Sequence, residues 1–468
     1  MKLKSIHINS FRSIEDIHFD IIRLEDNSYT YGLIGVNEVG KSSILKAISL
    51  KGSVVKPIVK DFVDENTIRI DYQYEVDENE IEEFKNILRT QTPEINLDSV
   101  KFNDLILGIY FDKSNPEQQS ISLEISSIEG VDEKEKILEQ LKQLIYDKSH
   151  KPIFWTSEDR FLISRPINLT EFESDPDNIS IPLRNCFALA GIIGSESIKK
   201  QISLISDSTE RELLKDTLGE KVTEHINNAW PKHKIKITFD ISDGLLNFHV
   251  RDLNSKGKAK TADQRSDGFK QFVSFLLTVS AQNKNNELTN SLLILDEPET
   301  HLHPQAQEDL LLELIKITQN DMNNVAIFAT HSNYMIDKND LSRNYKITKD
   351  INGTEMARFD KKLSTYSSVT YEVFDIPTTD YHSELYSALH QKYIEEDENN
   401  KERLHILDFD TNYLRIINGL KKDNLWKSKK NGATLPTYIR NCIDHPDNGN
   451  KYSIDQLRKS IEMMKTFK

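Results

Sequence analysis

The chain has 468 residues, and its 60 Lys and Arg against 75 Asp and Glu give a net charge of −15. Because the phosphate backbone of DNA or RNA repels so acidic a protein, a general nucleic-acid binder is excluded, and any such contact needs a local basic patch. No run of about 18 apolar residues occurs, so we expect no membrane-spanning helix and no membrane partner.

The N-terminus and the cysteines bear on the compartment. Residues 1–11 alternate apolar and polar side chains and lack the continuous apolar core of a signal peptide. The two cysteines, Cys186 and Cys442, lie far apart, and neither belongs to a CxxC pair. A disulfide framework or a structural zinc site is therefore not expected, and we predict a soluble, cytoplasmic protein.

Apolar runs and alternation predict an α/β protein. Taken in chain order, strands are expected at 3–8, 17–21, 29–34, 68–74, 105–111 and 121–125, with helices near 44–48, 81–88 and 138–145. A helical segment at about 176–230 follows, then strands at 235–239, 246–250, 292–295 and 325–329, with a helix at 310–317. Beyond about residue 350 the pattern is mostly helical, and no sustained heptad array appears, which excludes a long coiled-coil arm.

The strand at 29–34 leads into a phosphate-binding motif. The segment from Gly35 to Ser42 reads GVNEVGKS, which fits GxxxxGK[ST], and it lies between a predicted strand and a predicted helix. Backbone N–H groups of such a loop wrap phosphates at the positive end of the helix. We expect Lys41 to pair with the β- and γ-phosphates and the Ser42 hydroxyl to ligate Mg²⁺. The alternative is an accidental glycine-rich loop.

A second motif follows the strand at 292–295, where two carboxylates, Asp296 and Glu297, come at the strand's C-terminal end. Open α/β sheets bind ligands at this edge. We expect Asp296 to hold Mg²⁺ and Glu297 to orient the attacking water and accept its proton. The alternative is a pair that caps a helix.

A third motif, Thr330-His331-Ser332, follows the buried strand at 325–329. About one helix and one strand separate the carboxylate strand from this motif. In a parallel sheet, this spacing places His331 beside the first two motifs. A hydrogen bond from His331 to the γ-phosphate is expected to sense hydrolysis. A structural histidine is the alternative.

These motifs, in this order, resemble the ABC ATPase superfamily and its RecF/SMC-like branch. The resemblance implies an ABC ATPase head with ATP and Mg²⁺ as its ligands, and it adds Arg12, Asn37, Gly40 and Ser43 to the ATP-binding residues. The segment 264–272, QRSDGFKQF, resembles the ABC signature, which implies that Ser266 and Gly268 contact the γ-phosphate held by a second copy. A head-to-tail homo-oligomer with composite ATP sites is therefore expected. The segment 152–162 holds no glutamine where this branch resumes its core strands.

The resemblance divides the chain into four parts. We expect an N-terminal ATPase part at 1–175, a helical insertion lobe at 176–232, a C-terminal ATPase part at 233–350 and a mostly helical region at 351–468. A short lobe without a coiled coil resembles the OLD-like and RecF-like ATPases of anti-phage systems such as PARIS and Septu. This implies a sensor-regulator that holds a toxic partner nuclease and answers a phage-encoded trigger. A RecF-like DNA-repair ATPase is an alternative.

The C-terminal region carries a possible second site. Arg440, Asn441 and His445 resemble the R-N-x-x-x-H signature of HEPN ribonucleases, in which the arginine stabilises the charged transition state and the histidine moves protons. The basic segment from Lys421 to Lys430 precedes it, and its lysines with Trp426 could contact RNA or DNA. An active tRNA-cleaving ribonuclease, an inactive HEPN-like module and a coincidence all stay open.

Overall fold

The computed structural model describes residues 1–52, 54–63, 67–91, 102, 104–125, 134–229, 234–253, 260–261, 267–281, 288–319, 322–337, 339–351, 353–359, 365–396, 401–417 and 432–467. These residues fall into two compact units, Met1–Phe359 (unit 1) and Asp360–Lys468 (unit 2). Each unit has its own apolar core.

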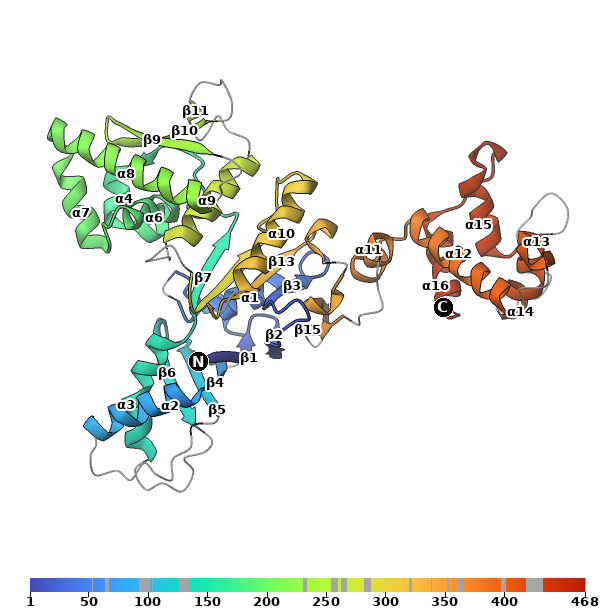
Figure 1. Cartoon of the computed structure of the whole chain (residues 1–468), viewed down its shortest axis with the longest axis horizontal. Helices are drawn as coiled ribbons and strands as arrows, with labels where there is room; N and C mark the ends of the chain where they lie inside the picture. The colour runs from blue at the N-terminus through green and yellow to red at the C-terminus, as the bar shows by residue number, and fades with distance from the viewer. Residues whose placement is uncertain are drawn as a thin grey trace. The chain divides into compact units, whose positions relative to one another are not determined.

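A six-stranded sheet in the order β15-β14-β3-β13-β12-β7 forms the centre of unit 1 (Figure 1). Its strands are β3 (Thr30–Ile34), β7 (Lys151–Thr156), β12 (Ser291–Asp296), β13 (Val325–Thr330), β14 (Asn344–Asp350) and β15 (Gly353–Arg358). All neighbours are parallel except β14 and β15. Every residue of β3, β12 and β13 is buried, as their unbroken apolar runs predict for strands covered on both faces. Helices α1 (Lys41–Ser49) and α10 (Pro304–Gln319) pack against this sheet.

A second, antiparallel sheet in the order β2-β1-β4-β5-β6 lies beside the first. Its elements are β1 (Lys2–Phe11), β2 (Ile14–Asp20), β4 (Thr67–Glu75), β5 (Asp104–Asp112) and β6 (Asn115–Ile125), with helices α2 (Glu78–Gln91) and α3 (Lys134–Lys148). Isoleucines and tyrosines of β4 alternate toward the core at residues 68, 70, 72 and 74, which is why this stretch folds as a strand.

A lobe of helices and a small antiparallel sheet is inserted between β7 and β12. It holds β8 (Ile167–Asn168), α4 (Leu169–Ser174), α5 (Pro176–Ile179), α6 (Ile181–Leu189), α7 (Ser195–Leu204), α8 (Ser208–Ala229), β9 (Ile235–Ser242), β10 (Leu245–Asp252), β11 (Lys260–Thr261) and α9 (Asp267–Ala281). Helix α8 packs on β9, and α9 packs on α6 and α8. The lobe therefore connects α9 firmly to the other lobe helices.

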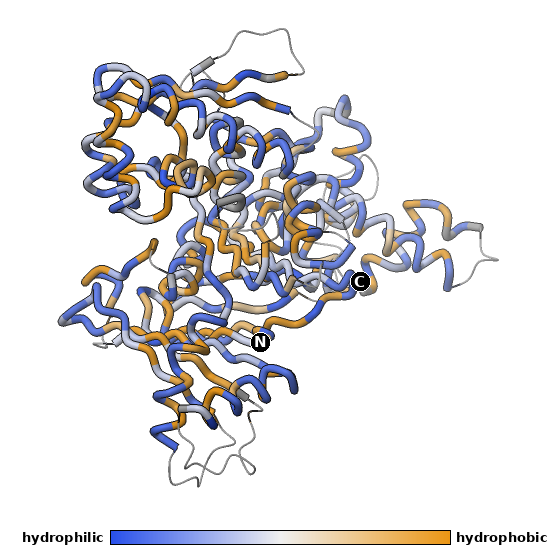
Figure 2. Tube along the Cα trace, turned by 60° about the vertical axis from the view of Figure 1, so that its left-hand side comes forward, coloured by the Kyte–Doolittle hydropathy of each residue, from blue (hydrophilic) through white to orange (hydrophobic). Residues whose placement is uncertain are grey.

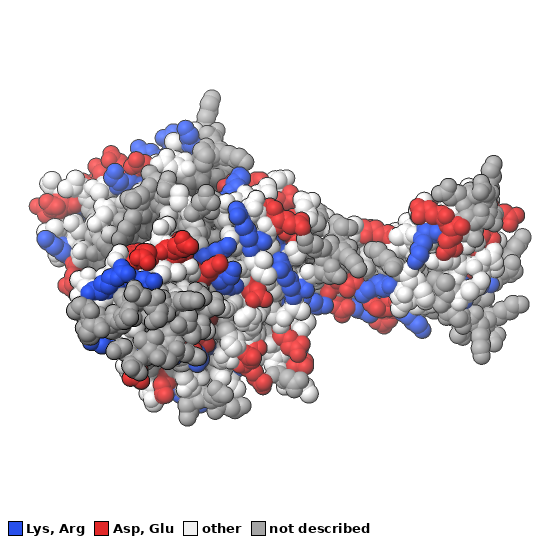
Figure 3. Space-filling view, turned by 60° about the horizontal axis from the view of Figure 1, so that its bottom comes forward, with Lys and Arg blue, Asp and Glu red and all other residues white. Residues whose placement is uncertain are grey.

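Single helical turns complete unit 1, at η1 (Val59–Asp61), η3 (Asp159–Phe161), η5 (Asn333–Met335) and η6 (Leu341–Arg343). The predicted fold class, α/β with a mixed sheet and helices, is confirmed. Figure 2 shows the hydrophobic stretches along the strands of unit 1. On the described surface in Figure 3, acidic and basic side chains are intermixed, so this face shows no broad patch of one sign.

The hairpin of β14 and β15 is a difference from the mostly helical pattern expected beyond residue 350. Six residues, Gly353–Arg358, form a strand that pairs with β14 from Tyr345↔Arg358 to Asp350↔Gly353. The sequence contains a turn signal here, the dipeptide Asn352-Gly353, and Gly353 has φ +125°, a conformation that side chains rarely adopt. Tertiary pairing with the buried β3 fixes a segment whose own apolar pattern is weak.

Unit 2 is a small helical bundle. It holds α11 (Tyr366–Phe374), α12 (Thr379–Glu395), η7 (Lys401–Leu404), α13 (Ile406–Phe409), the π turn η8 (Asp410–Leu414), α14 (Arg415–Ile417), α15 (Leu435–Asp444), η10 (Pro446–Asn448) and α16 (Ile454–Lys465). Leu385, Ile439 and Ile461 bring α12, α15 and α16 into one core. Among the described residues of both units, no helix is long and apolar enough to cross a membrane.

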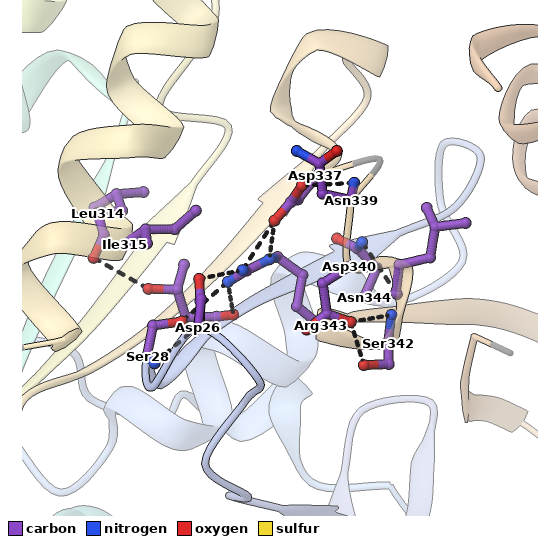
Figure 4. A network of polar contacts seen from close by, with 12 residues as sticks. Asp26, Ser28, Leu314, Ile315, Asp337, Asn339, Asp340, Ser342, Arg343 and Asn344 are labelled. Atoms are coloured by element: carbon purple, nitrogen blue, oxygen red, sulfur yellow. Dashed lines mark hydrogen bonds and ion pairs between the residues drawn. The ribbon is translucent and has the colours of Figure 1, made fainter. Parts of the chain in front are cut away.

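A buried arginine fixes the start of β14 (Figure 4). The guanidinium of Arg343, which is 0% exposed, donates to Asp26 at 2.6 Å, to Asp337 at 2.9 Å and to the hydroxyl of Ser28 at 3.1 Å. Burial raises the pKa of Asp26, but hydrogen bonds from Ser28 and the charge of Arg343 outweigh it, and the pKa is lowered. The network joins the segment before β3 to the segment after β13.

We expect Arg343→Met to destabilise unit 1 by about 3 kcal/mol, because it leaves two carboxylates without their buried partner. The exposed pair of Lys316 and Glu313 provides the control, since Lys316→Met should change stability by less than about 1 kcal/mol. Thermal unfolding of the two variants measures the difference. Equal melting temperatures would show that the Arg343 network does not hold the sheet together.

Candidate functional site

The phosphate-loop motif lies between β3 and α1, as the sequence predicts, and it rests on the β14–β15 hairpin. A Cβ at Gly35 would lie 2.5 Å from the Ile347 carbonyl oxygen, and one at Gly40, which has φ +110°, would lie 2.4 Å from Thr354 Oγ1. Only glycine permits both close approaches. The Thr354 hydroxyl also donates to the Val39 carbonyl at 3.2 Å. The close contacts with Ile347 and Thr354 therefore show that the β14–β15 hairpin supports the conformation of the phosphate loop.

Lys41 is the first residue of α1, and its amine donates to the carbonyls of Gly35 and Val36, both at 2.9 Å. Burial lowers the pKa of Lys41 to about 8, although the negative charges of Glu297 and Asp296 oppose this effect. The amine thus lies between the loop and the two carboxylates, where it can meet an anionic ligand.

The Ser42 hydroxyl donates to Asp296 Oδ1 at 3.0 Å, so the helix after the loop contacts the end of β12. Burial raises the pKa of Asp296 above its ordinary value, although the hydrogen bond from Ser42 opposes this effect. A hydroxyl and a carboxylate side by side form a set of hard oxygen donors, which fits Mg²⁺ when phosphate and water supply its other ligands.

Glu297 and His331 form a pair. The imidazole Nε2 lies 3.2 Å from Glu297 Oε1, and this hydrogen bond lowers the pKa of Glu297. Register explains the pairing: Asp296 faces Ala329 across β12 and β13, so the residues after each strand meet at one edge of the sheet. Glu297 has φ +51°, a conformation that is uncommon outside glycine and often found at functional sites.

Two further residues connect the segments after β12 and β13, and the sequence analysis did not single them out. Glu299, which is 4% exposed, accepts from the Thr330 hydroxyl and from the His331 backbone N–H. Gln307 accepts from the Ser332 hydroxyl and donates to the Leu302 carbonyl at 2.9 Å. Glu299 lies two residues after Glu297, which is a usable signal, whereas no sequence pattern marks Gln307.

Burial raises the pKa of Glu299 to about 7. Its Oε2 atom is buried and has no hydrogen-bond partner among the described residues. The carboxyl group thus lies against the His331 backbone in surroundings that disfavour its charged form.

Three further residues that the resemblance adds lie in the turn after β1, in the phosphate loop and in α1. Arg12 donates from Nε to Asp61 at 2.7 Å, Asn37 is exposed in the loop, and Ser43 is half-buried in the first turn of α1. Of the signature residues, Ser266 lies outside the described residues. Gly268, in the first turn of α9, packs so closely on the loop after β12 that a Cβ would lie 2.5 Å from the His301 carbonyl oxygen.

In unit 2, Arg440 and Asn441 lie on α15, and His445 is the residue at its C-terminal cap. The Arg440 guanidinium pairs with Asp444 at 2.6 Å and donates to Asn441 Oδ1 at 3.1 Å, and His445 is exposed. The basic segment from Lys421 to Lys430 lies outside the described residues. Among the described residues, no three His, Cys, Asp or Glu side chains are grouped to hold a metal ion.

The fold and the site define a P-loop ATPase. The model of the AAA ATPase domain family matches residues 1–336, and the chain belongs to this family. The predicted relationship to ABC-type ATPases of the RecF/SMC/OLD-like kind is confirmed by this match together with the relatives below.

Two curated relatives were found. An uncharacterised protein of Methanocaldococcus jannaschii is 26% identical over 123 residues, which cover 25% of this chain and 31% of that protein. The Old nuclease of Escherichia phage P2 is 28% identical over 82 residues, 18% of this chain and 14% of the nuclease. The chain therefore spans less than a third of the length of either relative.

Among solved structures, an SMC head bound to the C-terminal winged-helix domain of ScpA aligns with a TM-score of 0.43 and 12% identity, covering 77% of this chain and 98% of that one. The SMC head domain of Thermotoga maritima aligns with a TM-score of 0.37 and 11% identity, covering 77% and 100%.

We expect Glu299→Gln to stabilise the protein relative to the parent as the pH rises. Between the ordinary pKa of 4.5 and the folded value of about 7, the folded parent binds more protons than the unfolded chain, so its stability falls as the pH rises through this window. The glutamine has no proton to lose, and the relative gain should be on the order of 3 kcal/mol.

Thermal unfolding of both proteins at about pH 5 and about pH 8 measures this difference. Glu313→Gln, at an exposed position on α10, is the control and should follow the parent at both values. A difference between Glu299→Gln and the parent that is the same at both pH values would contradict a proton held on Glu299.

Proposed function

We propose that the chain is an ATP-binding and ATP-hydrolysing sensor-regulator that dimerises through composite ATP sites and controls a toxic nuclease, a partner protein, in anti-phage defence in the cytoplasm. The ATPase part of this proposal rests on one observation. At one edge of the central sheet, Lys41 contacts the phosphate loop, Ser42 contacts Asp296, and Glu297 contacts His331. These are the groups that phosphoryl transfer to water requires.

In this mechanism Lys41 exchanges its two loop carbonyls for the β- and γ-phosphates of ATP. Ser42 and Asp296 would hold Mg²⁺, which when bound supplies neutralisation of phosphate charge. Glu297 orients the attacking water and accepts its proton, and its lowered pKa keeps the carboxylate ionised before the reaction. His331, 3.2 Å from Glu297, donates toward the γ-phosphate and so couples the carboxylate to the presence of that group.

The composite site is supported by the position of the signature segment. Gly268 packs on the loop after β12 rather than on the phosphate loop of its own chain, so it does not complete the ATP site of its own copy. Ser266 and Gly268 of one copy would then contact the γ-phosphate held by the other. ATP would in this way join two copies head to tail.

Control of a nuclease is supported by two observations. The chain is similar over part of its length to a protein named Old nuclease from a phage, and a separate helical unit follows the ATPase unit. We propose that unit 2 holds the partner nuclease and that a phage-encoded trigger, sensed through the ATP cycle, releases it. A RecF-like repair role is the alternative in which DNA replaces the partner.

We expect Lys41→Ala and Glu297→Gln to fail differently. The lysine carries phosphate charge, so its loss should abolish ATP binding. The glutamate acts on water, so its amide should lower turnover by about 10²-fold or more while ATP stays bound and the dimer persists. The two variants are distinguished by measuring ATP binding, the rate of ATP hydrolysis and the molecular mass of the assembly for each protein. Glu313→Gln is the control and should behave like the parent. Normal turnover by Glu297→Gln would remove this mechanism.

The alternative enzyme, a self-contained HEPN-like ribonuclease, requires Arg440 and His445 to act on RNA. The ion pair of Arg440 with Asp444 at 2.6 Å already neutralises that cation, which favours the partner nuclease. We expect the purified chain with ATP to leave total tRNA intact over a concentration series, with and without phage lysate as the source of trigger. Cleavage that disappears in both Arg440→Ala and His445→Ala would establish the ribonuclease instead.

A further inference from the structure

A cavity of unit 1 lies at the other end of α1 from the phosphate loop. Its volume is about 900 Å³, and it opens between the end of α1, the start of β7, the end of α3 and the helices α6 to α8 of the lobe. The rise of α1 from Lys41 to Ser49 separates it from the ATP site by roughly 12 Å. None of the residues placed in the ATP site lines it.

Positive charge gathers in this cavity. Its lining includes Lys51, Lys151 and Arg184 against a single carboxylate, Asp147. Asp147 accepts from the Gln143 side chain at 2.9 Å, and Arg184 is partly neutralised by Asp177 outside the lining. The lining therefore carries more positive than negative side chains, although the net charge of the whole chain is −15. Such a lining favours the binding of anions.

Lys51 is the most unusual of these groups. It is 4% exposed, its amine donates to the His150 carbonyl at 2.5 Å, and it lies over the Tyr146 ring at 5.1 Å. The carboxylate of Asp147 acts on Lys51 through its charge, without a hydrogen bond to the amine. Burial, together with the nearby charge of Lys151, lowers the pKa of Lys51 to about 7, although the charge of Asp147 opposes this effect. A buried ammonium group is costly, and a bound anion would offset that cost.

The opposite wall is apolar. Leu189, Ile192, Ile193 and Ile198 line it, and the side chain of Ile193 is 66% exposed. They lie around the loop between α6 and α7, where Gly191 and Gly194 have φ +82° and +86°. Ligand cavities of this size commonly combine apolar walls with a few polar groups that fix orientation.

We propose that this cavity binds a small organic anion, with its acidic group at Lys51, Lys151 and Arg184 and its apolar body against Leu189, Ile192 and Ile198. The ligand is a metabolite-sized phosphate, sulfonate or carboxylate rather than a macromolecule, because a cavity of about 900 Å³ has the size of a small-molecule site.

The cavity is connected to the signature helix. Arg184 donates to Asn185 Oδ1 at 3.1 Å. Asn185 in turn donates at 3.4 Å to the hydroxyl of Thr278, a residue of α9. Helix α9 begins beside Gly268. A ligand that draws Arg184 inward therefore acts on the lobe that the composite ATP site requires, and this regulatory consequence rests on the proposed function. The binding itself does not.

Two fluorescent probes with one aromatic body test the binding. Anilinonaphthalene sulfonate carries an anionic group, and N-phenylnaphthylamine lacks it. Both are titrated into the full chain carrying Lys41→Ala, so that the phosphate loop cannot contribute. We expect saturable binding of the sulfonate at one site per chain, weakened about 10-fold by Lys51→Met or Lys151→Met, with little change for the neutral amine.

Lys199→Met, an exposed lysine of α7 outside the lining, is the matched control and should leave both probes unchanged. Lys151 is exposed, so its variant keeps the test valid if Lys51→Met does not fold. Equal loss of both probes, or sulfonate binding that neither methionine variant weakens, would overturn the anion site and leave only an apolar cavity. A sulfonate that binds here but leaves ATP turnover of the unmodified chain unchanged would contradict the regulatory consequence alone.

Discussion

The register of three buried parallel strands is the constraint on which the site depends. Strands β3, β13 and β12 end at the same edge of the central sheet, with Ile34 facing Thr330 and Ala329 facing Asp296. The phosphate loop, the histidine loop and the two carboxylates, which are far apart in sequence, therefore meet within hydrogen-bonding distance. A shift of one residue between β12 and β13 would turn every side chain of one strand to the other face and separate Glu297 from His331.

Polar contacts then join the loops that the strands bring together. Glu299 and Gln307 connect the segment after β12 to the segment after β13, and Gly268 packs on the same segment at His301. A change at His331 can thus be passed to the signature helix through contacts within one copy. The phosphate loop also contacts β15, because the Thr354 hydroxyl donates to the Val39 carbonyl. Strand β15 is the last strand before unit 2, so the loop directly contacts the strand that leads to the second unit.

The sequence predicted the elements whose patterns are strong and local. The apolar runs at 292–295 and 325–329 and the motif from Gly35 to Ser42 were found where the structure has them. The β14–β15 hairpin was missed because its strands are amphipathic and depend on pairing with β3. Gln307 and Thr354 were missed because an isolated polar residue acquires its role only from the fold around it. The roles of all the predicted site residues, including Arg12, Asn37, Ser43, Ser266, Arg440 and His445, stay predictions.

The central claim is that two copies complete each ATP site. The measurement that tests it most directly is the rate of ATP hydrolysis per chain, determined over a wide range of protein concentration. A composite site predicts that the rate per chain rises with concentration and levels off as dimers form, since a lone copy lacks Ser266 and Gly268 of its partner. A rate per chain that is constant down to concentrations at which the protein is monomeric would show that one copy is sufficient and would contradict the account.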